Sequence, residues 1–209
     1  MKLLLVGATG LVGHHVLQQA LNDPDISKIV VLTRSAIEAH PKLDVIDVDF
    51  DNLPQSAAWW DVDSVICTLG TTMRNAKTKT QFRRVDYDYP LAIASMARQH
   101  GATSFVLNSS MGANVSSRFF YNQVKGEIEA AITQLNYPSL TIVRPGLIEG
   151  KRNEKRLGEQ LMLNFIKVFA GLIPKSMQAN PARNIAHHMI EAALQQKQGI
   201  TFIRAKQLR

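Results

Sequence analysis

Residues 2–13 read KLLLVGATGLVG, a short apolar run that ends at Gly7 and continues through Gly10 and Gly13. The apolar run predicts a buried strand, and the segment from Leu11 predicts a helix. Gly7 permits a tight turn, Gly10 lets a ligand approach the backbone, and Gly13 lets the helix pack close to a sheet. The free N–H groups that begin such a helix attract phosphate. We therefore predict a dinucleotide-binding turn formed by Gly7, Ala8, Thr9, Gly10, Leu11, Val12 and Gly13.

Strand-like and helix-like segments alternate along the rest of the chain, and the strands are mostly continuous β-branched or apolar runs typical of parallel strands buried on both faces. We expect strands at 2–6, 28–33, 43–48, 64–68, 103–108, 139–144 and 200–204. We expect helices near 11–22, 80–100, 117–136, 157–170 and 181–196. This pattern predicts an α/β fold, a Rossmann-type doubly wound parallel sheet of about seven strands in the order 3-2-1-4-5-6-7.

The length of 209 residues suits one domain. We expect a single NAD(P)-binding Rossmann domain over residues 1–209, with a short C-terminal substrate lobe. Residues 147–180 interrupt the alternation and carry the charged run KRNEKR, so we expect them to form a small lid or substrate insertion above the strand ends.

Composition narrows the class of protein. Hydrophobic residues make up 45% and charged residues 20%, which is typical of a globular protein and predicts no membrane insertion. The single cysteine, Cys67, suits a reducing compartment, and we expect a cytoplasmic location. The formal charge is +7, but the cations are scattered and lack interleaved aromatic residues, so we expect no nucleic-acid binding. Four of the six histidines occur as the adjacent pairs 14–15 and 187–188, whose side chains diverge, so we expect no metal site.

The end of the second strand bears on which cofactor the turn binds. An acidic residue there suits the free 2′-hydroxyl of NAD, whereas this chain has Arg34 and Ser35, with the nearest carboxylate at Glu38. An arginine donates two parallel hydrogen bonds to a 2′-phosphate. We therefore expect NADP(H) rather than NAD(H), the alternative being that Arg34 is a solvated surface residue. Asp49, after the third strand, either contacts adenine or serves the turn that contains it.

Tyr121 and Lys125 lie four residues apart in a predicted helix and so project from one face. Asn108-Ser109-Ser110 ends the preceding strand at the ligand-binding edge. A free phenol has a pKa near 10, and a nearby ammonium stabilises the phenolate, so such a group suits proton transfer to a carbonyl at neutral pH. We predict Ser110, Tyr121 and Lys125 as catalytic residues, with Ser109 as the alternative to Ser110.

These motifs, together with Arg144-Pro-Gly146, resemble the short-chain dehydrogenase/reductase superfamily in its extended or atypical branch. The stretches CTLGTT (67–72), SSMGANVSSRFFYNQVKGEIE (109–129) and VRPGLIEG (143–150) resemble the Tat-interacting-protein (HTATIP2-like) oxidoreductase family in its bacterial members. The resemblance implies Tyr121 as proton donor or acceptor. It also implies a nicotinamide site to which Cys67, Leu69, Gly70, Tyr121, Lys125, Pro145, Gly146 and Leu147 contribute.

The sequence thus predicts an NADP(H)-dependent oxidoreductase that acts on an unidentified small carbonyl or alcohol substrate. The alternative is a catalytically silent NADPH-binding protein that regulates or assembles with a protein partner. We expect a monomer or a homodimer.

Overall fold

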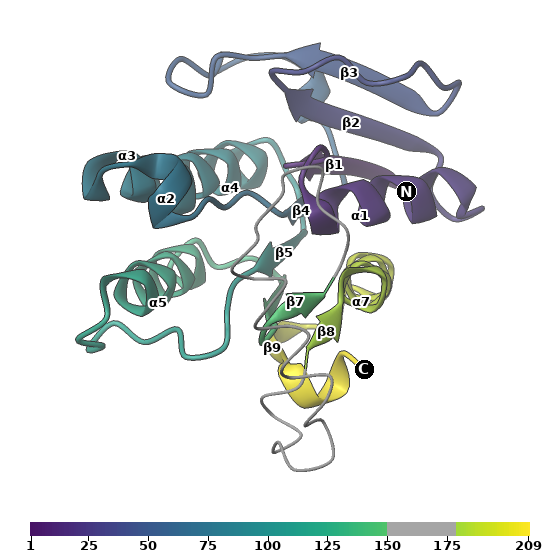
Figure 1. Ribbon diagram of the computed structural model, residues 1–209. Helices are drawn as coiled ribbons and strands as arrows, with labels where there is room; N and C mark the ends of the chain where they lie inside the picture. Colours follow the sequence, from purple (N-terminus) through teal and green to yellow (C-terminus); the bar gives the residue numbers. More distant parts are fainter. Residues whose placement is uncertain (150–178) are drawn as a thin grey trace.

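The computed structural model describes residues 1–149 and 179–209. Its centre is a seven-stranded sheet in which every neighbouring pair is parallel and the strand order is β3-β2-β1-β4-β5-β6-β9 (Figure 1). The strands are β1 (Lys2–Val6), β2 (Lys28–Thr33), β3 (Leu43–Asp47), β4 (Ser64–Cys67), β5 (Ser104–Asn108), β6 (Ser139–Arg144) and β9 (Gly199–Arg204). The predicted Rossmann-type sheet and its strand order are confirmed, with β9 as the seventh strand.

Helices cover both faces of this sheet. On one face, α1 (Leu11–Asn22) and α7 (Ala182–Gln195) lie against each other, and on the other face lie α4 (Tyr89–Gln99) and α5 (Phe120–Thr133) (Figure 1). The described residues also form five shorter helical segments: η1 (Ala58–Trp60), α2 (Met73–Ala76), α3 (Lys79–Arg83), η2 (Arg84–Asp88) and η4 (Ala205–Gln207). The result is a three-layer arrangement with a hydrophobic core on each side of the sheet.

The first strand shows why the strands are apolar throughout. Leu4 and Val6 pack into the core beneath α4 and α5, whereas Leu3 and Leu5 pack into the core beneath α1 and α7, and all four are fully buried. Successive side chains of a strand point to opposite faces, so a strand with helices on both sides has no polar face. The run LLLV therefore fixes β1 in the middle of the sheet.

The prediction of one α-helix over residues 80–100 is wrong. It is divided into α3, a π-helical turn η2 (Arg84–Asp88) and α4. The cause is Pro90 in the first turn of α4, which has no N–H to donate to the carbonyl of Asp86 and whose ring would clash with that carbonyl in an α-helix. The backbone widens by one residue there instead.

Two further boundaries differ from expectation. The helix expected from Ser117 begins at Phe120, because Ser117 and Phe119 are held in a turn by hydrogen bonds to Asn114 O and to Ser117 Oγ. The short strands β7 (Ile148–Glu149) and β8 (Asn180–Pro181) pair in parallel, and neither was expected. They flank residues 150–178, so the expected helix at 157–170 and most of the expected lid at 147–180 lie outside the described residues and stay predictions.

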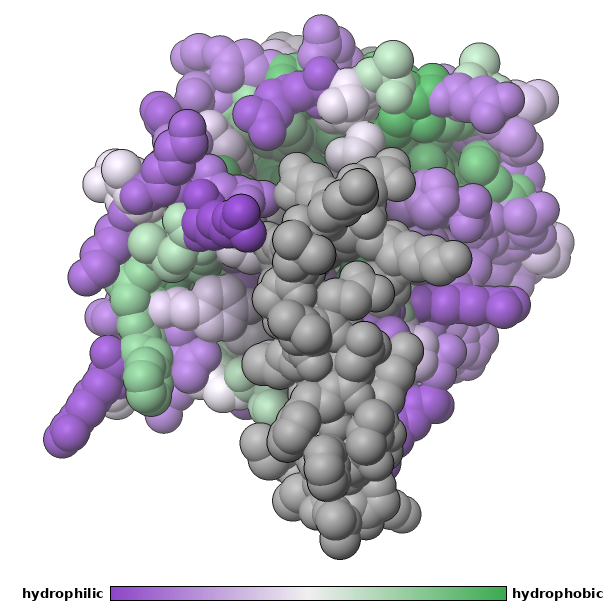
Figure 2. Space-filling model, viewed as in Figure 1, coloured by the Kyte–Doolittle hydropathy of each residue, from purple (hydrophilic) through white to green (hydrophobic). Residues whose placement is uncertain are grey.

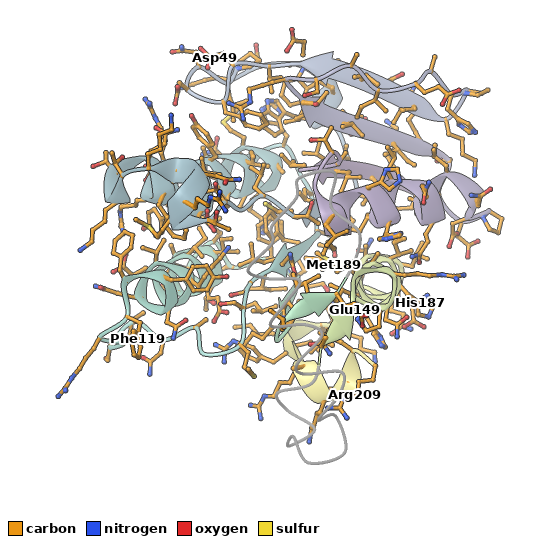
Figure 3. The ribbon with its side chains drawn as sticks, in the orientation of Figure 1. Asp49, Phe119, Glu149, His187, Met189 and Arg209 are labelled. Carbon is orange, nitrogen blue, oxygen red and sulfur yellow. The ribbon has the colours of Figure 1, made fainter. Side chains whose placement is uncertain are left out.

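Within residues 1–149 and 179–209, no helix combines the length and apolar character needed to cross a bilayer. Most of the face seen in Figure 2 is hydrophilic, and apolar surface is visible at the upper right and, at the lower left, beside the first turn of α5. Phe119, labelled in Figure 3, lies there with 74% of its side chain exposed. Met111 and Val115, from the same loop, are also exposed.

Candidate functional site

The glycine turn joins β1 to α1 as the sequence predicts. Gly7 has φ +86°, a backbone conformation that favours glycine, and its carbonyl accepts a 2.9 Å hydrogen bond from Gly10 N. A Cβ on Gly13 would lie 2.6 Å from Thr68 Oγ1 and closer still to the Gly7 carbonyl oxygen. Close packing of α1 on the turn therefore requires glycine at 13. Thr68, which we did not predict, donates to the carbonyls of Val6 (2.9 Å) and Gly7 (3.1 Å).

The beginning of α1 fits the phosphates of a dinucleotide. Gly10 is the N-cap residue, and it has no side chain that could cap the helix. The first N–H groups of α1 are therefore available to donate hydrogen bonds to a ligand. Thr9 and Gly10 are exposed, whereas Ala8, Val12 and Gly13 are buried and Leu11 is half-buried. The backbone at Gly10 is therefore open to a ligand, because no side chain covers it.

Arg34 and Ser35 follow β2 and are both exposed. The backbone is held there by Thr33, whose hydroxyl accepts from Ser35 N at 3.0 Å and donates to Ser35 O at 3.1 Å. The Arg34 guanidinium lies 6.0 Å from the centre of the Phe50 ring, and among the described residues it forms no ion pair. Arg34 is thus exposed at the end of β2 and has no carboxylate partner among the described residues.

Asp49 serves the turn that contains it. Its carboxylate accepts from Asp51 N at 3.0 Å and from Asn52 Nδ2 at 2.7 Å. The Asn52 bond first, and the backbone bond second, hold the pKa of Asp49 below its ordinary value. Of the two interpretations of Asp49, the structure supports turn formation.

Cys67 ends β4, and Leu69 and Gly70, which the family resemblance assigns to the cofactor, lie in the loop that follows. Cys67 is fully buried and belongs to the core beneath α4 and α5, and burial raises the pKa of its thiol to about 11. A neutral, enclosed thiol is inert. Leu69 is half-buried and Gly70 exposed, so this loop emerges from the core at Gly70.

Tyr121 and Lys125 occupy neighbouring turns of one face of α5, as predicted. Lys125 is 5% exposed, whereas Tyr121 is 39% exposed and packs edge-on against the Phe82 ring. The ammonium of Lys125 forms an ion pair with Asp86 Oδ1 at 2.8 Å. Burial works against the charged lysine, but Asp86 and then Tyr121 favour it, and the pKa of Lys125 lies above its ordinary value.

Asp86 was not predicted, and it changes the expected role of Lys125. From the sequence we expect the ammonium to act on Tyr121, whereas in the structure it also forms an ion pair with the Asp86 carboxylate. A signal was present in the sequence: Asp86 lies four residues after the apolar Phe82, a spacing that predicts one face of a helix, but this spacing does not identify Lys125 as its partner. An ionised residue is rarely buried unless it is paired.

The structure distinguishes Ser109 from Ser110. The Ser109 hydroxyl donates to Glu129 of α5, and the same carboxylate accepts from Arg144 Nε (3.0 Å) and Nη2. Ser110 is also buried, but its hydroxyl has no hydrogen-bond partner among the described residues. The Ser109 hydroxyl therefore bonds the loop to α5. The Ser110 hydroxyl uses neither its donor nor its acceptor on another described residue.

Residues 145–147 are tied to both neighbouring segments. The carbonyl of the buried Pro145 accepts from Met111 N (2.7 Å), and Gly146 N donates to Asn180 Oδ1 (2.8 Å). Asn180, fully buried, also donates from Nδ2 to Ala205 O at 2.8 Å, and its own N–H donates to Leu147 O at 2.7 Å. Asn180, which we did not predict, thereby fixes the chain on either side of residues 150–178.

No group of three histidine, cysteine, aspartate or glutamate side chains suited to a metal ion occurs in the described ranges. His187 and His188 each lie near Glu191 on α7, at 3.7 and 3.3 Å, in ordinary intrahelical pairs.

Residues 7–163 match the family model described as NAD(P)H-binding. The chain belongs to this NAD(P)H-binding family. This match supports a nicotinamide nucleotide as the ligand of the domain.

Two curated relatives show which members of the family this chain resembles in sequence. It is 37% identical to protein HTATIP2 of Rattus norvegicus over 180 residues, which cover 84% of this chain and 72% of that protein. It is 36% identical to "Protein FMP52, mitochondrial" of Lodderomyces elongisporus over 182 residues, which cover 81% and 76%. The predicted resemblance to the HTATIP2-like proteins is confirmed.

Solved structures show the same fold at low sequence identity. A UDP-glucuronic acid 4-epimerase of Bacillus cereus in complex with NAD has a TM-score of 0.72 at 14% identity, covering 99% of this chain and 78% of that chain. The PhqB reductase domain of Penicillium fellutanum has a TM-score of 0.69 at 19% identity, covering 97% and 66%. These likenesses show that the chain has the Rossmann-type fold.

Proposed function

We propose that the protein is an NADP(H)-dependent oxidoreductase of the short-chain dehydrogenase/reductase type, acting on a small carbonyl or alcohol substrate. The observation that carries this proposal is the exposed Tyr121 phenol one helical turn from the buried, charged Lys125. A catalytically silent nucleotide-binding protein has no need of a desolvated ammonium beside a solvent-facing phenol.

The nucleotide would be held by the turn from Gly7 to Gly13, with Arg34 and Ser35 at the adenosine end. Leu69, Gly70 and residues 145–147 would lie toward the nicotinamide end. Bound NADPH supplies a hydride to the substrate carbonyl. The rest of the chemistry belongs to the side chains, which must orient the substrate oxygen and move one proton.

Tyr121 is the group that gives its proton to the substrate oxygen during reduction and takes it back during oxidation. Lys125 stabilises the negative charge that forms on the phenol oxygen, because an ammonium about 4 Å away is worth on the order of 4 kcal/mol at an effective dielectric constant near 20. Its pairing with Asp86 reduces that effect without removing it. Ser110, whose hydroxyl has no hydrogen-bond partner in residues 1–149 and 179–209, donates a hydrogen bond to the same substrate oxygen and polarises it.

The test is a panel of small aldehydes, ketones and quinones, with loss of NADPH absorbance as the measurement. We expect Tyr121→Phe to reduce kcat/KM about 10²- to 10⁴-fold, the usual worth of a general acid, while its affinity for NADPH stays near that of wild type. Tyr137→Phe is the matched control, because Tyr137 is a core phenol bonded to Ala94 O. Equal background rates in wild type and Tyr121→Phe on every substrate would mean that the silent, regulatory alternative holds.

The preference for NADP(H) over NAD(H) rests on Arg34. The neighbouring carboxylate of Asp51 accepts from the Tyr89 hydroxyl (2.8 Å) and pairs with Arg84 (2.9 Å), so its charge is already balanced. Arg34→Asn removes a charged donor, and we expect the Kd for NADPH to rise about 10- to 100-fold. NADH, which lacks the 2′-phosphate, is the internal control and should bind equally to both proteins. A similar loss for both nucleotides would contradict a 2′-phosphate site at Arg34.

We also propose that the protein is cytoplasmic and that it is a monomer or a homodimer. The buried single thiol suits a reducing compartment. The fungal relatives carry the word mitochondrial in their names. Fractionation of the source cells, with the elution volume of the purified protein on gel filtration, tests both.

A further inference from the structure

Asp86 lies between two parts of the candidate site that are distant in sequence. Its Oδ2 accepts a hydrogen bond from the backbone N–H of Thr71 at 2.8 Å, and its Oδ1 pairs with Lys125 Nζ at 2.8 Å. Only 1% of its surface is exposed. One carboxylate thus contacts both the loop after β4 and the lysine of α5.

Gly70 completes this arrangement. A Cβ at this position would lie 3.4 Å from Asp86 Oδ1 and 3.7 Å from Lys125 Nζ. The exposed backbone of the loop therefore passes directly over the ion pair. A nucleotide that contacts Leu69 and Gly70 lies against a backbone whose next N–H, at Thr71, is fixed by the same carboxylate that fixes Lys125.

The π-helical turn accounts for the position of Asp86. Because Pro90 denies the Asp86 carbonyl its α-helical hydrogen bond, η2 is wider than an α-helix at this point. Single π-helical turns of this kind occur frequently at functional sites. Here the turn delivers a charged side chain into a buried layer between α3, α5 and the loop after β4.

We propose that Asp86 is a positioning residue for this site, which holds Lys125 as a cation and couples it to the cofactor-binding loop at residues 69–72. The proposal rests on the proposed function for its catalytic meaning. Asp86 touches neither substrate nor the reacting atoms, and acts through Lys125 and the loop.

The charge of Asp86 is the property that matters. Lys125 is almost completely buried, and burial alone would favour the neutral amine. Three titratable groups face its ammonium: Asp86 from η2, Tyr121 from α5 itself and Cys67 from β4. Burial keeps the Cys67 thiol neutral, so the carboxylate of Asp86, which pairs with the ammonium at 2.8 Å, supplies the negative charge.

The decisive variant is Asp86→Asn. Asparagine keeps the size of the side chain and an oxygen that can accept from Thr71 N, but it removes the charge. The ionisation of Lys125 is measured in the nucleotide-free protein by NMR of ¹³C-labelled lysine, with the resonance assigned by its loss in Lys125→Arg. We expect its pKa to fall by about one to three pH units in Asp86→Asn, the range for a charge lost at contact distance.

Two further measurements test how the loss of the Asp86 charge affects cofactor binding and catalysis. We expect the Kd of Asp86→Asn for NADPH, measured by fluorescence, to rise about 10-fold. The alkaline limb of the kcat/KM profile should move to lower pH, because Lys125 now loses its proton earlier. Asp88→Asn is the matched control: Asp88 is in the same turn but exposed, and its removal should leave all three measurements at wild-type values.

The outcomes separate this proposal from the proposed function. If no substrate is turned over, the proposed function fails, while the lysine titration and the NADPH affinity still test Asp86. An unchanged Lys125 titration in Asp86→Asn overturns the proposal. If that variant does not fold, the wild type decides: the proposal requires the buried Lys125 to stay protonated at neutral pH, and titration below the ordinary range of lysine overturns it.

Discussion

At the scale of single residues, Ser109 and Ser110 are adjacent and both buried, yet they have different partners. The Ser109 hydroxyl is bonded to Glu129, whereas that of Ser110 is unpaired among the described residues. We expect Ser109→Ala to lower the free energy of unfolding by about 1–3 kcal/mol, the worth of a buried hydrogen bond to a charged group. We expect Ser110→Ala to leave stability unchanged and to reduce kcat/KM at least about 10-fold.

Urea unfolding followed by tryptophan fluorescence, together with NADPH turnover, measures both effects in the same preparations. The two variants are each other's controls, since each removes one hydroxyl from neighbouring positions. If Ser109→Ala lost turnover at unchanged stability, the roles assigned to the two hydroxyls would have to be exchanged.

The site residues that the sequence predicts are those whose roles depend on near neighbours. Gly7 to Gly13 form one turn, and Tyr121 and Lys125 are separated by one helical turn, so spacing alone brings them together. The partners that fix them come from distant segments: Asp86 for Lys125, Glu129 for Ser109 and Asn180 for Gly146. No periodicity specifies such pairs, because they form only when the helices and loops pack on the sheet.

At the scale of elements, the strands were predicted more closely than the helices. A strand buried on both faces is a continuous apolar run, and β1, β2 and β6 have the predicted bounds. Helix ends depend on local hydrogen bonds that compete with the helix, such as those that delay α5 until Phe120. Pro90 divides the helix expected over 80–100, because a proline inside a helix removes a backbone hydrogen bond and its ring clashes with the preceding turn.

At the scale of the whole molecule, the alternation of strands and helices with right-handed crossovers leaves few possible sheets, and this is why the complete strand order was predictable. What the sequence could not predict is the closure of the site by the end of the chain. Asn180 bonds to Gly146 and to the carbonyls of Ala205 and Leu208, so the last residues support the loop that follows β6.

The central position of Cys67 predicts how the stability of the whole fold depends on alkaline pH. Burial raises the pKa of this thiol from 9.0 to about 11. Below pH 9 the thiol is protonated in both states, and its contribution is fully present. As pH rises from 9 toward 11 the unfolded chain ionises first and binds fewer protons than the folded one. The free energy of unfolding therefore falls, by roughly 2–3 kcal/mol for two pH units.

The measurement is urea unfolding at a series of pH values for wild type and Cys67→Ala, compared by slope rather than by absolute stability because the substitution also removes buried volume. Other buried groups contribute to the alkaline slope in both proteins, including Tyr137, whose pKa burial also raises. The difference between the two slopes therefore isolates Cys67. We expect the fall above pH 9 to be shallower in Cys67→Ala, and identical slopes would show that the thiol ionises without disturbing β4.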